Sequence, residues 1–163
     1  MASSQPRDTG LAWDADRAAA IIAAHAGMEG PLLPALHALQ AAFGHVPAEA
    51  VPALAHAFNL SRADVHGVVS FYHDFRDHLA GRHVLRLCRA EACQAMGGDA
   101  LAARARERLG IGWGETTADG AVTLEPVFCL GLCACSPSAM LDGALHGRLD
   151  AATLDALLDE VTP

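Results

Sequence analysis

The sequence predicts an α+β chain in which an N-terminal helical bundle precedes a domain of strands and helices. Apolar residues recur at helical spacing through the first half, whereas the second half has short apolar runs that end near cysteines or turn dipeptides. All five cysteines lie beyond residue 80. The chain has 163 residues, 52% of them apolar, which is enough to bury a core. We place the domain boundary between residues 80 and 81.

The N-terminal domain, residues 1–80, is expected to contain four helices. Residues 1–12 carry no pattern and are expected to form a loose tail. The first three helices each begin near a favourable N-terminal residue and end near glycine or asparagine. They are predicted over residues 14–26, 31–44 and 47–59. Ser61-Arg-Ala-Asp64 opens the fourth helix, because it resembles a capping box with aspartate in the place of glutamate.

The C-terminal domain, residues 81–163, is expected to have the element order β-α-β-β-α. A linker over residues 78–82 leads to a buried strand that ends at Cys88, and a second strand ends beside Cys129. A hairpin is predicted to turn at Asp142-Gly143. The strands are predicted over residues 83–88, 121–128, 138–142 and 145–149, and the helices over 99–109 and 150–161. This order is that of a thioredoxin-like fold.

Charge and hydropathy exclude several classes of function. The formal net charge is −8 and no run of Lys or Arg occurs, so we expect no nucleic-acid partner. The N-terminus has no basic-then-apolar signal, and the longest near-apolar run there, residues 18–24, is too short to span a bilayer. We therefore expect a cytoplasmic protein with no membrane partner. In that compartment five cysteines indicate metal or redox chemistry more than disulfides.

Two close cysteine pairs carry the predicted chemistry. Cys88 and Cys93 have C-x4-C spacing, and Cys129 and Cys133 have C-x3-C spacing. Four thiolates suit a [2Fe–2S] cluster or a tetrahedral zinc ion. The spacing favours the cluster because structural zinc sites most often use shorter loops. A zinc-stabilised interaction module without a redox role remains the alternative, and Cys135 is interpreted as a spare thiol.

Glycines near these cysteines are the other candidate features of the site. Gly97, Gly98 and Gly131 are expected to let backbone N–H groups approach sulfur, where hydrogen bonds tune the reduction potential. A thioredoxin-type dithiol would use C-x2-C spacing, which the sequence lacks. No catalytic triad, phosphate-binding glycine loop or dinucleotide fingerprint is found, so no catalytic residue is predicted.

Several motifs together indicate a family. They are Val68-Val-Ser-Phe-Tyr72, Cys88-x4-Cys93, Gly114-Glu-Thr-Thr-Ala-Asp-Gly120, and Cys129-Leu-Gly-Leu-Cys133 before Ser136-Pro137. Over roughly residues 15–160 the sequence resembles the thioredoxin-like [2Fe–2S] ferredoxins of the NuoE-type family of NADH dehydrogenase subunits. The resemblance implies one [2Fe–2S] cluster, and it implies as its ligands Cys88, Cys93, Cys129 and Cys133. The family more often has no cysteine at the position of Cys135.

Within that family, two segments are most similar to the gamma subunit of soluble NAD-dependent molybdenum formate dehydrogenases. They are Phe71-Tyr-His-Asp-Phe-Arg76 and Leu85-Arg-Leu-Cys-Arg-Ala-Glu-Ala-Cys93. This likeness implies an electron-transfer subunit of a hetero-oligomer, with a flavin- and NAD-binding beta subunit and a molybdenum-containing alpha subunit as partners. FMN, [4Fe–4S] clusters and molybdopterin are then expected only on the partners, and the chain alone has no turnover. The alternative is the equivalent subunit of complex I or of an NAD-reducing hydrogenase.

Overall fold

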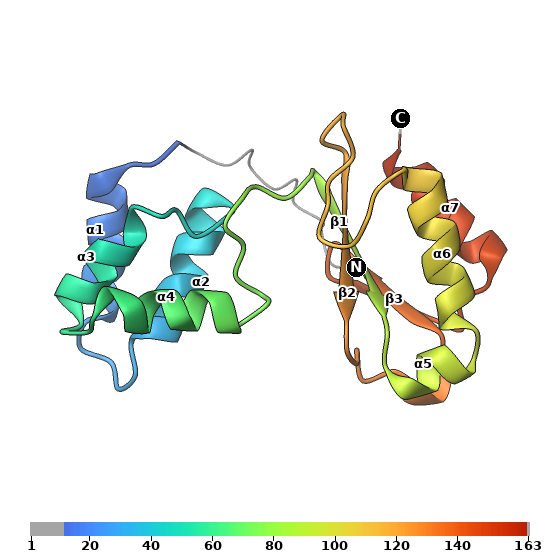
Figure 1. Ribbon diagram of the computed structural model, residues 1–163, viewed down its shortest axis with the longest axis horizontal. Coiled ribbons are helices and arrows are strands. Elements are labelled where there is room, and N and C mark those ends of the chain that lie inside the picture. Colours follow the sequence, from blue (N-terminus) through green and yellow to red (C-terminus); the bar gives the residue numbers. More distant parts are fainter. Residues whose placement is uncertain (1–11, 163) are drawn as a thin grey trace. The chain divides into compact units, whose positions relative to one another are not determined.

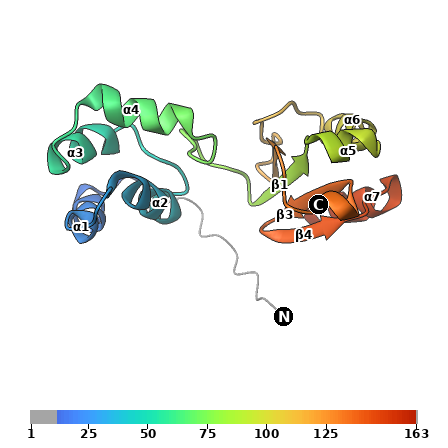
Figure 2. The same ribbon diagram turned by 90° about the horizontal axis from the view of Figure 1, so that it is seen from below.

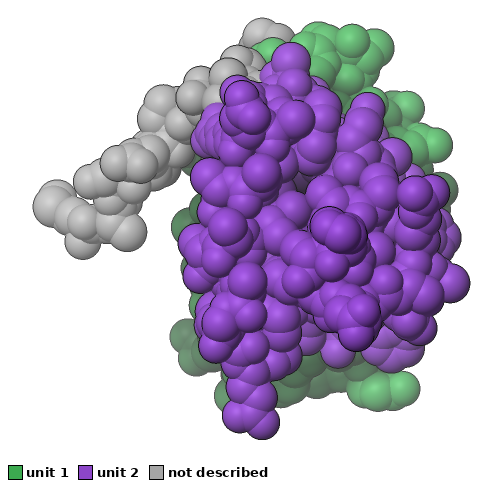
Figure 3. Space-filling model, turned by 90° about the vertical axis from the view of Figure 1, so that its left-hand side faces the viewer, with its two compact units in different colours: residues 1–6, 80–163 green, residues 7–79 purple. Residues whose placement is uncertain are grey.

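The computed structural model describes residues 12–162, and the chain divides into two compact units between Leu79 and Ala80. The helical unit is the purple body in Figure 3, and Figure 1 labels the elements of both units. Most of the predicted loose tail, residues 1–11, lies outside the described residues. Within residues 12–162, no helix has both the length and the apolar character that crossing a bilayer requires.

The helical unit contains the four helices that the sequence predicts. They are α1 (Ala15–His25), α2 (Leu32–Phe43), α3 (Ala50–Ala57) and α4 (Arg62–Phe71). The Asp14 side chain caps α1 by accepting the Arg17 N–H at 2.9 Å. Gly44 ends α2 in the left-handed region, with φ of 78°. Helix α3 begins later than predicted because the chain first forms tight turns. In these turns the carbonyls of Pro47 and Ala48 accept hydrogen bonds from the N–H groups three residues further along the chain.

The predicted capping box of α4 is confirmed. The Ser61 hydroxyl accepts the Asp64 N–H at 3.0 Å, and the Asp64 carboxylate accepts the Ser61 N–H at 3.1 Å. Hydrogen bonds from the side chain and backbone of Ser61 lower the pKa of Asp64 below its usual value. The box therefore fixes where α4 begins, and Val65 of this helix is fully buried in the core.

A glutamine holds the segment that follows α4 against the helical core. The Gln40 amide donates to the Asp74 carbonyl at 2.6 Å and accepts the Arg76 N–H at 2.7 Å. The Arg76 carbonyl then accepts the Val46 N–H at 2.8 Å. The core beneath this segment is apolar, and its fully buried members include Leu36, Leu39, Phe43, Leu54 and Val65. One side chain of α2 thus fixes the chain as it leaves the bundle.

The second unit is built on a four-stranded sheet with the order β2-β1-β3-β4. Its strands are β1 (His83–Cys88), β2 (Val122–Val127), β3 (Ser138–Leu141) and β4 (Ala144–Gly147). Strands β1 and β2 are parallel, whereas β1–β3 and β3–β4 are antiparallel. The predicted hairpin turn is confirmed, because Asp142 and Gly143 connect β3 to β4 with φ of 50° and 91°.

Helices α6 (Gly98–Leu109) and α7 (Ala151–Val161) cover one face of this sheet (Figures 1 and 2). Their small and apolar side chains share one core with the strand residues Leu85, Leu87, Val122 and Leu124. The α+β, thioredoxin-like architecture expected from the sequence is therefore observed. A single layer of helices leaves the loops at the strand ends free to carry the site.

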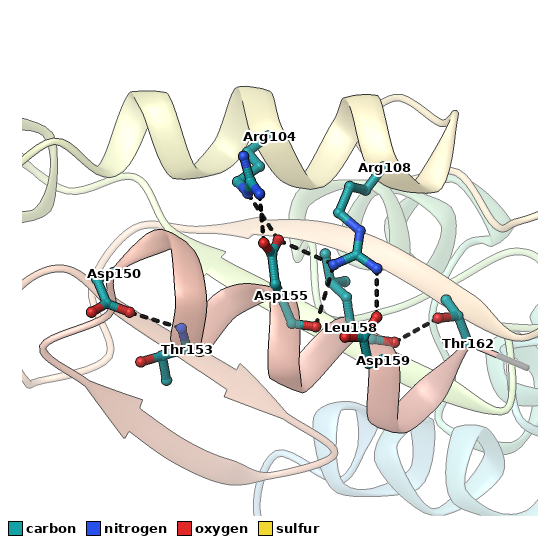
Figure 4. A network of polar contacts seen from close by, with 8 residues as sticks. All are labelled: Arg104, Arg108, Asp150, Thr153, Asp155, Leu158, Asp159 and Thr162. Atoms are coloured by element: carbon teal, nitrogen blue, oxygen red, sulfur yellow. Dashed lines mark hydrogen bonds and ion pairs between the residues drawn. The ribbon is translucent and has the colours of Figure 1, made fainter.

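Two arginines of α6 bind two aspartates of α7 (Figure 4). Arg104 donates to both carboxylate oxygens of Asp155, at 2.8 Å from Nε and 2.5 Å from its terminal nitrogen. Arg108 lies 3.1 Å from the Asp155 carboxylate and 2.6 Å from that of Asp159. The hydrogen bond from Arg104, with a further one from Arg108, lowers the pKa of Asp155 to about 2. These contacts join the two covering helices along their exposed edge.

Four parts of the second unit differ from the sequence prediction. A short helix, α5 (Glu91–Ala95), occupies the first cysteine loop, where we expected only a turn. Five residues are too few to show helical periodicity, although Glu, Ala and Gln all favour helix. Strand β2 ends at Val127, two residues before Cys129, and β4 ends at Gly147 instead of residue 149. A 3-10 turn also forms over Cys133–Cys135.

Candidate metal centre

The two cysteine loops leave the sheet at the same edge. Cys88 is the last residue of β1, and its partner across the parallel pair is Val127, the last residue of β2. The Arg89 N–H donates to the Val127 carbonyl at 2.7 Å, so the hydrogen bonding between the two strands continues one residue beyond Cys88. Because the carboxyl ends of parallel neighbours meet at one edge, the loop with Cys93 and the loop with Cys129 and Cys133 begin side by side.

The first cysteine pair is buried. Cys88 is 5% exposed, and Cys93, which α5 carries, is 2% exposed. The Cys93 sulfur lies 3.6 Å from the Ser136 Oγ and 3.5 Å from the Ser138 Oγ. Burial raises the pKa of Cys93, but hydrogen bonds with Ser138, Ser136 and Cys88 outweigh it and leave the pKa below its usual value. The surroundings of Cys93 therefore favour the thiolate, the form that binds metals.

The second pair is exposed. The Cys129 and Cys133 sulfur atoms are 3.7 Å apart, and the Gly131 N–H points at the Cys129 sulfur at 3.3 Å. Gly131 adopts φ of +78°, a conformation that favours glycine. The approach of a backbone N–H to sulfur that we expected at Gly131 is therefore observed. Two thiolates on one tetrahedral metal at about 2.3 Å would lie about 3.8 Å apart. The separation of this pair matches that geometry.

The four predicted ligands interact electrostatically. Hydrogen bonding to Cys129 and the charge of Cys129 raise the pKa of Cys133, and burial and the charges of Cys93 and Cys88 raise it further. Neighbouring thiolates repel one another, and a cationic iron centre bound by them would relieve that repulsion. The donor set thus fits an iron–sulfur group. Among residues 12–162, no three His, Cys, Asp or Glu side chains lie close enough together to hold a metal ion.

Gly98 has a packing role that differs from the expected one. A Cβ placed on Gly98 would lie 2.6 Å from the Cys93 carbonyl oxygen, so the close approach is to backbone and not to sulfur. Gly98 thereby lets the N-terminus of α6 pack onto the helix that holds Cys93. Gly97, with φ of +89°, forms the left-handed residue immediately before α6. The structure therefore gives Gly97 a role in turn formation and Gly98 a role in packing, in place of the expected approach to sulfur.

Cys135 is anchored to β4. Its carbonyl accepts the Arg148 N–H at 2.6 Å, and a Cβ on Gly147 would lie 2.9 Å from the Cys135 Cβ. Sequence reasoning missed Ser136 and Ser138 as parts of the site. The only signal for them was a pair of hydroxyl residues flanking Pro137, directly after the cysteine motif.

Comparison with known proteins decides the family. The sequence profile described as thioredoxin-like [2Fe-2S] ferredoxin matches residues 18–162, which is most of the chain. The chain belongs to this family. This [2Fe–2S] ferredoxin therefore carries one [2Fe–2S] cluster, so the family favours the cluster over the zinc site that spacing alone left open.

Relatives of this ferredoxin are subunits of larger oxidoreductases. It is 40% identical over 113 residues to an NADH-quinone oxidoreductase subunit of Pseudomonas aeruginosa, covering 69% of this chain and 68% of that protein. It is 32% identical over 132 residues to the NADP-reducing hydrogenase subunit HndA of Solidesulfovibrio fructosivorans, covering 81% and 77%.

A solved structure is also similar. A chain of the NAD+-reducing [NiFe]-hydrogenase in the air-oxidized state superposes with a TM-score of 0.68 at 30% identity. The match covers 80% of this chain but only 22% of the hydrogenase chain. The ferredoxin thus corresponds to about a fifth of that longer chain.

Proposed function

We propose that this ferredoxin is an electron-transfer subunit whose [2Fe–2S] cluster is bound by Cys88, Cys93, Cys129 and Cys133. The observation that carries the ligand assignment is the pairing of Cys88 with Val127 at the ends of two adjacent parallel strands. This pairing brings both cysteine loops to one edge of the sheet. In this proposal residues 81–163 form the cluster-binding domain, and residues 1–80 form a helical domain that supports assembly.

The protein side chains divide the site into a buried and an exposed part. When bound, a [2Fe–2S] cluster accepts and releases one electron between its ferric and ferrous states. Cys88 and Cys93 are held by β1 and α5 away from water, which fixes one side of the site. Cys129 and Cys133 face solvent, and the Gly131 N–H stabilises charge on the Cys129 sulfur. A partner can approach from this exposed side.

For the parent enzyme we propose a cytoplasmic NAD-dependent formate dehydrogenase, in which this chain is the gamma subunit. The support is the likeness of residues 71–76 and 85–93 to that subunit. The partners would be the flavin- and NAD-binding beta subunit and the molybdenum-containing alpha subunit. The alternative is the equivalent subunit of an NADH-quinone oxidoreductase or of an NAD-reducing hydrogenase, which the names of the relatives favour.

Two serine variants test the ligand assignment. Cys129→Ser replaces a proposed ligand by a weaker one, so the purified chain should lose most of its iron. Cys135→Ser changes a thiol of the same loop that is anchored to β4, and it should keep about two irons per chain. Iron quantification with visible absorption on the same samples measures both. Full iron retention in Cys129→Ser would refute the assignment.

Purification of the native complex tests the parent enzyme. An affinity tag on this chain should recover the complex from its own cells under anaerobic conditions. Molybdenum in the complex, with formate-dependent reduction of NAD+, is the result expected for the formate dehydrogenase. Nickel with hydrogen-dependent NAD+ reduction, or quinone reduction by NADH without molybdenum, would assign the chain to one of the two alternatives.

A further inference from the structure

Two serine hydroxyls lie beside the same ligand sulfur, but their hydrogen-bonding states differ. The Cys93 sulfur is 3.5 Å from the Ser138 Oγ and 3.6 Å from the Ser136 Oγ. Ser138 is the first residue of β3 and is 3% exposed, one of only two polar residues buried to this degree among residues 12–162. A buried hydroxyl this close to sulfur has little access to water as an alternative partner.

The direction of the hydroxyl proton distinguishes the two serines. A serine side chain has a single O–H donor. Ser136 gives its proton to the Cys133 carbonyl at 2.7 Å, so it is already engaged as a donor. A metal-bound cysteine carries no proton and can only accept. Of the two hydroxyls, that of Ser138 is therefore the one that can donate to the Cys93 sulfur in the cluster-bound protein.

We infer that Ser138 is a positioning residue that donates a hydrogen bond to the Cys93 thiolate and raises the reduction potential of the cluster. The inference rests on the proposed role of Cys93 as a ligand. Reduction adds one negative charge to the centre, and a donor aimed at a ligand sulfur stabilises that charge. Because Ser138 is fixed in β3 and buried, its dipole is already oriented before the electron arrives.

The test is an EPR-monitored redox titration of the full-length purified protein with its cluster. Ser138→Ala removes the donor with little change in volume. Its equilibrium constant for one-electron reduction should fall roughly two- to tenfold, the range expected for one net hydrogen bond. A tenfold fall corresponds to a midpoint about 59 mV more negative. Ser138→Thr keeps a hydroxyl on the same backbone position and should restore the midpoint toward that of the wild type.

Ser136→Ala is the matched control, because it removes a hydroxyl at nearly the same distance from the same sulfur. Since the Ser136 proton is directed to the Cys133 carbonyl, this variant should shift the midpoint less than Ser138→Ala does. A second readout is the exchangeable-proton coupling in the ENDOR spectrum of the reduced protein before and after transfer to D2O. The coupling assigned to the hydroxyl should vanish in Ser138→Ala and persist in Ser136→Ala.

The outcomes separate this inference from the proposed function. An unchanged midpoint in Ser138→Ala, or equal shifts in Ser138→Ala and Ser136→Ala, would overturn the role of Ser138 and leave the ligands intact. If Ser138→Ala loses its iron, Ser138→Thr decides the question. Retention of iron and of the wild-type midpoint by Ser138→Thr would support the role of the hydroxyl, whereas loss of iron from Ser138→Thr would overturn the inference. Full iron retention by Cys93→Ala would instead overturn the ligand assignment itself.

Discussion

Gly98 offers a direct test of the packing behind the site. It is the first residue of α6, and an added Cβ would lie 2.6 Å from the Cys93 carbonyl oxygen and 3.0 Å from the Cys93 carbonyl carbon. Both atoms belong to the backbone of α5 and cannot rotate away. The Gly98→Ala variant must therefore separate α5 from α6. Overpacking of this kind costs about 1–3 kcal/mol.

Gly67 is the matched control in α4, because a Cβ there would meet no heavy atom within 4 Å. An alanine inside a helix is more stable than glycine by about 0.5–1 kcal/mol, so Gly67→Ala should raise the free energy of unfolding. The same gain partly offsets the overpacking at Gly98. Subtracting the two results isolates the overpacking, and Gly98→Ala should be less favourable than Gly67→Ala by about 1–3 kcal/mol.

The two tryptophans let each unit be followed by itself. Trp13 packs on the helical core and Trp113 on the core of the sheet unit. Urea unfolding of the cluster-loaded protein is monitored by tryptophan fluorescence. Gly98→Ala is studied in the Trp13→Phe background, in which Trp113 reports on the sheet unit. Gly67→Ala is studied in the Trp113→Phe background, in which Trp13 reports on the helical unit. Equal changes in the free energy of unfolding for the two alanine variants would refute the close approach of α6 to Cys93.

Two further predictions concern contacts remote from the site. Asp155→Asn removes the carboxylate that both α6 arginines bind, so its thermal midpoint at pH 7 should lie below that of the wild type. The pKa of Asp155 falls from 3.8 to about 2 on folding, so this advantage is present above pH 4 and disappears as the pH falls through about 2. A difference that persists unchanged at pH 2 would contradict this explanation. Gln40→Met removes the amide that holds the segment after α4, and hydrogen exchange at the Arg76 amide should accelerate by about two- to tenfold. Unchanged exchange at Arg76 would show that Gln40 does not restrain the segment.

Local signals made much of the fold predictable. The capping box at Ser61 and the Asp142-Gly143 turn depend on neighbouring residues, and both form as expected. The strand that delivers Cys88 has the predicted bounds because its apolar run and flanking residues define it. The short helix with Cys93 was missed because five residues cannot display a helical period.

The surroundings of the site were less predictable because they depend on tertiary contacts. The cysteine spacing indicated the four proposed ligands, but Ser138 lies 45 residues from Cys93 and reaches it only through the pairing of β3 with β1. The need for glycine at position 98 likewise arises from the packing of two helices. Neither contact leaves a pattern within one element of the sequence.

The measurement that tests the central claim most directly is an EPR spectrum of the purified, dithionite-reduced chain, with iron and zinc quantified on the same sample. We predict a low-temperature spin-half signal and about two irons per chain, as a [2Fe–2S] centre requires. A silent spectrum with about one zinc per chain would mean that the cysteines hold a structural ion. That result would contradict the electron-transfer function.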